Sequence, residues 1–129
     1  MQAKNIMTRD VITAGPAMPV RGLATLLIKN QISGVPVVDG RGKIIGVVSE
    51  ADIIAKKGKD VRSIMSKKLF TVEEETPIEK IAELMSANKI ARLPVLSKGR
   101  IVGIVSRADI IGAIASGQPI ALHTPVYDL

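Results

Sequence analysis

Two short sequences of the same form, Ser49-x-x-Asp52 and Ser106-x-x-Asp109, combine residue types that could bind a small anionic molecule. Each serine follows an apolar, β-branched run and precedes a segment typical of a helix, so each is expected at a helix N-cap. A hydroxyl, free backbone N–H groups and the helix dipole favour a phosphate at such a position. The spacing is also close to a capping box, in which the serine and the acid only stabilise the helix start. Both interpretations are open on the sequence alone.

These two sequences belong to a repeat that covers most of the chain, in which residues recur at an offset of about 58. Ile6-Met7 recurs as Ile64-Met65, and Pro36-Val37 recurs as Pro94-Val95. The second copy is then one residue shorter, and the deletion falls where a hairpin turn is expected. The elements that position the two Ser-x-x-Asp sequences are therefore duplicated.

Each copy predicts the element order strand, helix, strand, strand, helix. The first helix begins just after a proline and has apolar residues at i, i+3, i+4 and i+7, which indicates one buried stripe. The next two strands are β-branched runs joined by glycine-containing turns at residues 39–42 and 97–99, a pattern typical of hairpins. The predicted buried stripes are Val20, Leu23, Ala24, Leu27 and Ile28 in the first copy and Ile78, Ile81, Ala82 and Met85 in the second.

The predicted fold class is α/β (α+β), built from two β-α-β-β-α repeats. A single unit of about 60 residues would bury only about 60% of its unfolded surface, so we expect the two repeats to pack with pseudo-twofold symmetry. The predicted domains are residues 1–58 and 59–116, divided at a basic, glycine-containing connector, and a C-terminal tail follows at residues 117–129. The tail is too apolar for a solvated end, so we expect it to pack on the module or on a partner subunit.

The composition narrows the classes of function. The 129 residues carry a formal net charge of +6, which favours anionic partners. The chain has no cysteine and a single histidine, His123, so we expect no catalysis, no required cofactor and no metal site. No apolar run is long enough to cross a bilayer, so we expect a cytoplasmic protein without membrane contact.

The duplicated proline-led strand, glycine-centred apolar strand and Ser-x-x-Asp helix start resemble tandem cystathionine β-synthase (CBS) domains. The resemblance covers roughly residues 3 to 115. It implies a regulatory, non-catalytic module that binds an adenosine-containing molecule such as AMP, ADP, ATP or S-adenosylmethionine in clefts between the two repeats. It also implies a homodimer and a regulated protein partner.

By this resemblance, each copy supplies one set of ligand-binding residues. Asp52 or Asp109 would accept hydrogen bonds from two ribose hydroxyls, a task that suits the paired oxygens of a carboxylate. A serine would lie beside phosphate, threonine hydroxyls would add to the site, and residues around each proline would hold the base. The first predicted set is Thr13, Gly34, Val35, Pro36, Ser49 and Asp52, and the second is Thr71, Ile90, Ala91, Arg92, Leu93, Pro94, Ser106, Arg107 and Asp109. Alternatively, the threonines are ordinary strand residues and the aliphatic residues are plain core.

The two copies differ in charge at these expected sites. Arg92 and Arg107 of the second copy stand where the first copy has Gly34 and Glu50. A guanidinium group binds phosphate well, whereas a carboxylate repels it. We therefore predict that the second site is better suited to phosphate than the first. The alternative for Arg107 is a solvent-facing side chain in the first turn of its helix.

Two other functions stay open. The clefts could be empty, in which case the chain would serve only for dimerisation or protein interaction. Weak nucleic-acid binding by a basic surface is less favoured, because aromatic residues make up only 2% of the chain and base stacking has little support. That surface would comprise Lys56, Lys57, Lys59, Lys67, Lys68, Lys98 and Arg100.

Overall fold

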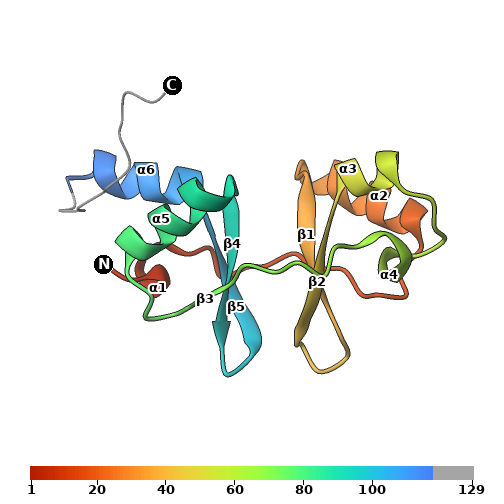
Figure 1. Ribbon diagram of the computed structural model, residues 1–129, viewed down its shortest axis with the longest axis horizontal. Helices are drawn as coiled ribbons and strands as arrows, with labels where there is room; N and C mark the ends of the chain where they lie inside the picture. The colour runs from red at the N-terminus through yellow and green to blue at the C-terminus, as the bar shows by residue number, and fades with distance from the viewer. Residues whose placement is uncertain (118–129) are drawn as a thin grey trace. The chain divides into compact units, whose positions relative to one another are not determined.

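The chain folds into helices and short strands in a computed structural model, which describes residues 1–117 (Figure 1). The mixed α/β class predicted from the sequence is confirmed. The elements in order are α1 (Ala3–Ile6), α2 (Val20–Asn30), β1 (Gly34–Val38), β2 (Ile44–Ser49), α3 (Glu50–Ala55), α4 (Val61–Ile64), β3 (Val72–Glu73), α5 (Ile78–Asn88), β4 (Arg92–Ser97), β5 (Arg100–Ser106) and α6 (Arg107–Ala115).

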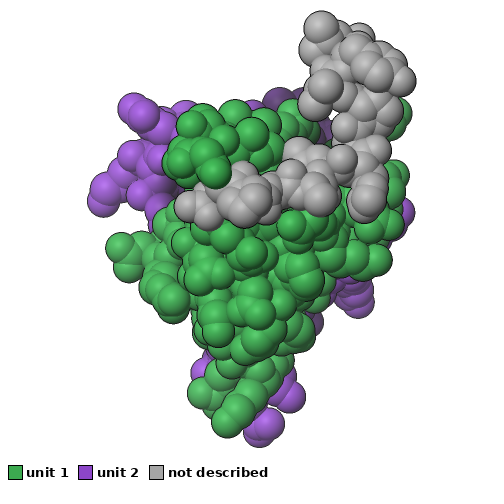
Figure 2. All heavy atoms as spheres, turned by 90° about the vertical axis from the view of Figure 1, so that its left-hand side faces the viewer, with its two compact units in different colours: residues 1–11, 70–129 green, residues 12–69 purple. Residues whose placement is uncertain are grey.

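The chain forms two compact units, coloured separately in Figure 2. Of the described residues, unit 1 contains Met1–Val11 and those from Phe70 onward, and unit 2 contains Ile12–Leu69. The segment at the start of each repeat therefore packs with the later elements of the other repeat. The packing divides the chain between residues 11 and 12 and between residues 69 and 70. The predicted boundary between residues 58 and 59 separates the two sequence repeats and not the packed units. It stays a prediction.

Each unit contains one antiparallel hairpin of the expected kind. In unit 1, β4 pairs antiparallel with β5 and parallel with β3, which gives a three-stranded sheet. In unit 2, β1 pairs antiparallel with β2, and the expected first strand is reduced to a single parallel bridge between Ala14 and Val37. Gly15 and Pro16 follow that bridge at once, and proline has no N–H group with which to extend the ladder.

The helices α2 and α5 place their apolar stripes in two separate cores. Leu23 and Leu27 of α2 are buried in unit 2, and Ile78, Ile81 and Met85 of α5 are buried in unit 1. The prediction that Ile28 completes the buried stripe of α2 was wrong, because this side chain is 81% exposed. The segments at the start of the two repeats, which pack with the other repeat and are called the exchanged segments below, complete both cores. They supply Ala3 to unit 1, and Val61 and Ile64 to unit 2.

Two glycines allow these exchanged segments to lie against the hairpins. A Cβ atom at Gly46 of β2 would lie 2.8 Å from Met65 Sδ and 2.8 Å from Ser66 O. A Cβ atom at Gly103 of β5 would lie 2.5 Å from Met7 Sδ. All three distances are shorter than real Cβ contacts, so a larger residue at the centre of either second strand would force its neighbours to shift. Isolated antiparallel bridges, Val47 with Ser66 and Thr8 with Ile104, mark the same contacts.

None of the helices within residues 1–117 is long and apolar enough to cross a bilayer. The cytoplasmic location expected from the sequence stays a prediction. His123 and nearly all of the predicted C-terminal tail lie outside the described residues.

Candidate functional site

Both Ser-x-x-Asp sequences form complete capping boxes. The Ser49 N–H group donates to Asp52 Oδ2 over 2.9 Å, and the Asp52 N–H group donates to Ser49 Oγ over 3.4 Å. In unit 1 the corresponding bonds join Ser106 N to Asp109 Oδ2 at 2.8 Å and Asp109 N to Ser106 Oγ at 3.1 Å. The serines are therefore the N-caps of α3 and α6, as predicted. The capping interpretation is confirmed, and a ligand role for the same groups stays a prediction.

The residues that precede each hairpin lie beside these helix starts. The Glu50 N–H group donates to Ser33 O over 2.8 Å, and the Arg107 N–H group donates to Ala91 O over 2.8 Å. The next residue of each loop, Gly34 or Arg92, begins the hairpin and lies directly opposite the capping serine in the ladder. The expected base-binding stretch and the Ser-x-x-Asp sequence of each copy therefore meet within one unit.

The two expected threonines lie next to the same hairpins. Thr13 directly precedes Ala14, which bridges to Val37 of β1, and Thr71 directly precedes Val72, which pairs with Val95 of β4. Both threonine side chains are partly exposed. All members of the first predicted set thus belong to unit 2, and all members of the second belong to unit 1.

The aliphatic members of the two sets divide by burial. Val35 and Leu93 belong to the hydrophobic cores of their units, so the plain-core interpretation describes their side chains. In the hairpin ladders Val35 lies opposite Val48, and Leu93 lies opposite Val105. Pro36 and Pro94 are buried at the third position of β1 and β4. Ile90 is partly buried, and Ala91 is exposed.

The cations predicted for the second site lie at its exposed margin. Arg92 begins β4 and Arg107 begins α6, and both side chains are exposed. At the equivalent place in unit 2, Gly34 leaves little room for a side chain, because a Cβ atom there would lie 3.0 Å from Val48 O and 3.3 Å from Ser49 Cβ. The charge difference predicted between the two copies is therefore built into the same structural positions.

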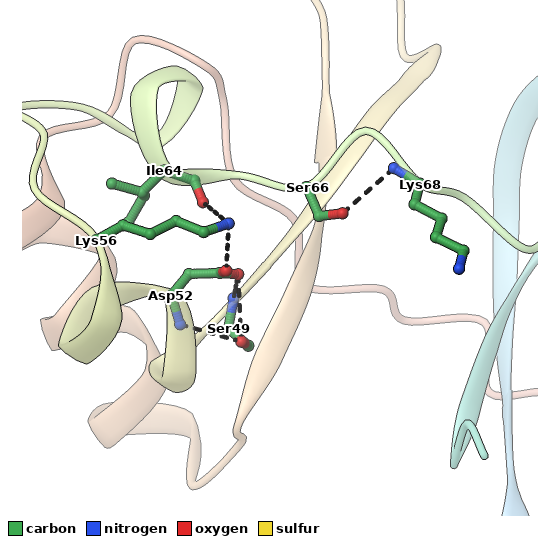
Figure 3. A network of polar contacts seen from close by, with 6 residues as sticks. All are labelled: Ser49, Asp52, Lys56, Ile64, Ser66 and Lys68. Atoms are coloured by element: carbon green, nitrogen blue, oxygen red, sulfur yellow. Dashed lines mark hydrogen bonds and ion pairs between the residues drawn. The ribbon is translucent and has the colours of Figure 1, made fainter. Parts of the chain in front are cut away.

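One ion pair was missed by the sequence interpretation. Lys56 Nζ lies 2.9 Å from Asp52 Oδ1 and donates a hydrogen bond to Ile64 O over 3.1 Å (Figure 3). The sequence interpretation assigned Lys56 to the connector and to a basic surface. The i, i+4 spacing of Asp52 and Lys56 on a helix was the available signal. Within residues 1–117, Asp109 has no such ion pair.

No group of three or more histidine, cysteine, aspartate or glutamate side chains that could hold a metal ion occurs in the described part of the chain. The candidate site therefore consists of carboxylate, hydroxyl and backbone groups, with cations at its margin. Such groups suit hydrogen bonding to a sugar and a phosphate.

Comparison with known proteins identifies the family. A model described as "CBS domain" matches residues 3–58 and again residues 61–116. The chain therefore belongs to the CBS domain family and contains two of these domains in tandem. This confirms the resemblance noted in the sequence.

Two solved structures of CBS domain pairs have the same fold. The CBS domain pair of protein MJ0100, in complex with 5′-methylthioadenosine and S-adenosyl-L-methionine, is 31% identical, with a TM-score of 0.82 over 92% of this chain and 98% of that chain. The protein CBSX2, in complex with AMP, is 27% identical, with a TM-score of 0.84 over 89% of this chain and 96% of that chain.

Among curated proteins, the inosine-5′-monophosphate dehydrogenase of Methanocaldococcus jannaschii is 34% identical over 113 residues. The match covers 85% of this chain and 23% of that enzyme. The chain thus spans less than a quarter of the length of the dehydrogenases it matches, and these enzymes contain the matched region only as a part.

Proposed function

We propose that the chain is a regulatory, non-catalytic module that binds an adenosine-containing ligand, namely AMP, ADP, ATP or S-adenosylmethionine. The observation that carries this proposal is the junction found in both units between the hairpin loop and the capped helix start. It supports a site in which base-binding backbone groups, a carboxylate and a helix N-cap lie within a few residues of one another. Two relatives solved with adenosine-containing ligands add support.

We assign each part of the ligand to a group of residues by the chemistry of their side chains and backbone. The carboxylates of Asp52 and Asp109 accept hydrogen bonds from ribose hydroxyls, because a carboxylate has lone pairs beyond those used by the cap. Backbone groups beside Pro36 and Pro94 bind the edge of the base. Thr13 and Thr71 contribute hydroxyl groups from the neighbouring short strand.

Phosphate binding is proposed for unit 1 in preference to unit 2. Arg92 and Arg107 flank Ser106 in unit 1, whereas Gly34 and Glu50 flank Ser49 in unit 2. Because a guanidinium group gains strong charge-assisted hydrogen bonds with phosphate, the arginines favour nucleotides over nucleosides. AMP, ADP and ATP are therefore expected to bind more tightly in unit 1.

Regulation would follow from linkage. A ligand that binds one conformation of the chain more tightly than another shifts the population toward that conformation. A protein partner that distinguishes the two conformations then responds to the ligand.

A thermal-shift panel tests this proposal. AMP, ADP, ATP, S-adenosylmethionine and NAD are added separately to the full chain. A ligand at 100 times its dissociation constant stabilises the folded state by about 2.7 kcal/mol, which raises the unfolding midpoint. A rise with at least one of the first four ligands is expected, and no rise with any of them would refute the proposal.

A homodimer is the second function that a specific observation favours. Ile54 of α3 is 86% exposed and Ile111 of α6 is 58% exposed, in addition to Ile28 of α2. Helices α2 and α3 contact each other, so Ile28 and Ile54 lie on neighbouring helices of unit 2. Exposed apolar side chains that gather on one surface are typical of interaction sites. We expect a dimeric mass in solution by sedimentation and a monomeric mass after Ile28→Arg and Ile54→Arg are combined. A monomeric wild-type chain would contradict this.

A further inference from the structure

We propose that Lys56 is a built-in competitor of the ligand at Asp52, which makes the unit 2 site the weaker one for nucleosides. This inference rests on the proposed function, because it assumes that the carboxylates bind the ribose hydroxyls. It adds a residue outside the predicted sets that controls which of the two carboxylates is available.

Both oxygens of Asp52 are engaged. Oδ2 accepts hydrogen bonds from the Ser49 N–H group at 2.9 Å and from Ser49 Oγ at 3.2 Å, which uses the lone pairs that face the cap. Oδ1, the oxygen left for a ligand, lies 2.9 Å from Lys56 Nζ. Two ribose hydroxyls cannot take the best positions on this carboxylate while the ammonium group remains there (Figure 3).

Lys56 is held in this position from a second side. Its ammonium group also donates to the carbonyl of Ile64, the last residue of α4, over 3.1 Å. A cation is favoured at a helix C-terminus, where carbonyl groups lack helical partners. The Lys56 side chain is 45% exposed and the Asp52 side chain only 17%, so the ion pair is partly shielded from water. Lys56 is therefore a positioned counter-ion of Asp52.

The second copy has the same cap without the lysine. Asp109 Oδ2 accepts from the Ser106 N–H group at 2.8 Å, and within residues 1–117 no cation pairs with Asp109. In the repeat, Lys56 corresponds to Ala113, which is buried because α6 continues to Ala115. Helix α3 ends at Ala55, and Lys56 is its C-cap. The residue four positions after the aspartate, lysine in one copy and alanine in the other, thus pairs Asp52 and leaves Asp109 without a cation in the described residues.

The consequence is largest for ligands without a phosphate. Adenosine brings hydroxyl groups to Asp52 but no anion to replace the carboxylate as the partner of Lys56. Its binding in unit 2 therefore includes the loss of an ion pair, whereas its binding in unit 1 does not. Adenosine is also the cleanest probe, because removal of a lysine does not weaken phosphate attraction in its complex.

Isothermal titration of adenosine into the full chain with Asp109→Asn tests the inference, because this substitution removes the unit 1 carboxylate. Adding Lys56→Met keeps most of the apolar stem and removes the ammonium group. We expect the affinity for adenosine to rise roughly two- to fivefold, the range set by a partly exposed ion pair. Lys57→Met, a neighbouring exposed lysine with the same loss of charge, is the matched control and is expected to change nothing. Adding Asp52→Asn to Lys56→Met should abolish the gain.

The possible results separate the two claims. An unchanged or lower adenosine affinity with Lys56→Met, while the Asp109→Asn protein still binds adenosine, would overturn the role of Lys56 and leave the proposed function intact. Equal gains with Lys56→Met and Lys57→Met would also overturn it, because the contact between Lys56 and Asp52 would then not be the cause. Failure of the wild-type chain to bind adenosine and AMP would overturn both. Circular dichroism melting of each variant establishes that the proteins compared are folded.

Discussion

Arg92 lies directly opposite Ser106 in the antiparallel ladder between β4 and β5. Residues opposite each other in such a ladder project from the same face, so the arginine and the N-cap of α6 share one side of the hairpin. In unit 2 the same relationship joins Gly34 to Ser49, without a cation. At equivalent ladder positions, arginine in unit 1 and glycine in unit 2 thus give the two candidate sites a different charge.

Arg92→Met is expected to weaken AMP binding about tenfold or more and to leave adenosine binding unchanged, because only AMP offers a phosphate for a charge-assisted hydrogen bond. Titration calorimetry with both ligands measures the difference. Arg100→Met, at the start of β5, is the matched control. A parallel loss for AMP and adenosine would show that Arg92 supports the fold and not the phosphate.

Ser106→Ala and Ser49→Ala are each expected to lower the free energy of unfolding by about 1 kcal/mol, because each removes the acceptor of a capping N–H group. Urea denaturation monitored by circular dichroism gives this value. Ser86→Ala, on the exposed face of α5, is the control and should cause no loss. Wild-type stability in both cap variants would argue that the boxes contribute nothing.

Gly103→Ala and Gly112→Ala are expected to have opposite effects. The first places a Cβ atom 2.5 Å from Met7 Sδ and should destabilise the protein by about 1–3 kcal/mol through overpacking. The second lies within α6 with no atom within 4 Å of the new Cβ, so it should stabilise the helix by about 0.5–1 kcal/mol. An unfolding midpoint that rises or stays the same after Gly103→Ala would contradict the packing of Met7 against β5.

Asp39 gives a prediction for acid pH. Backbone N–H groups of Arg41 and Lys43 donate to its carboxylate and lower the pKa of Asp39 below its usual 3.8. A carboxyl group with a lowered pKa in the folded state adds stability above its unfolded pKa and loses it as the pH falls through the folded pKa. The stability difference between wild type and Asp39→Asn should therefore be present at pH 6 and shrink below pH 3.8. A difference that is constant across this range would exclude the effect.

The sequence predicted the hairpins and long helices well because their signals are local. Proline at a helix start, glycine in a turn and serine at an N-cap each act within a few residues. The short helices α1 and α4 were not predicted. They contain only four residues each and depend on contacts with segments distant in the sequence. The exchange of segments between repeats was not predicted for the same reason. Gly46 and Gly103 were the available signal, because glycine lets another segment of the chain lie close to the strand.

The sequence predicted which residues belong to the two candidate sites. It did not predict which partners their side chains contact. The repeat places Asp52 and Asp109 at equivalent positions, and both form the expected cap. Their difference depends on Lys56, whose partners lie four and eight residues away and whose position depends on where α3 ends. Likewise, the exposure of Ile28 depends on which neighbours α2 has, and an amphipathic pattern alone does not give them.

The most direct test of the central claim is the affinity of the full chain for AMP after Asp109→Asn and, separately, after Asp52→Asn, measured by titration calorimetry on folded proteins. We predict that Asp109→Asn weakens AMP binding about tenfold or more, because a charged acceptor for the ribose hydroxyls is lost beside the two arginines. Asp52→Asn should cause a smaller loss. Affinity equal to that of the wild type in both variants would show that the two aspartates act only as helix caps and would contradict the account.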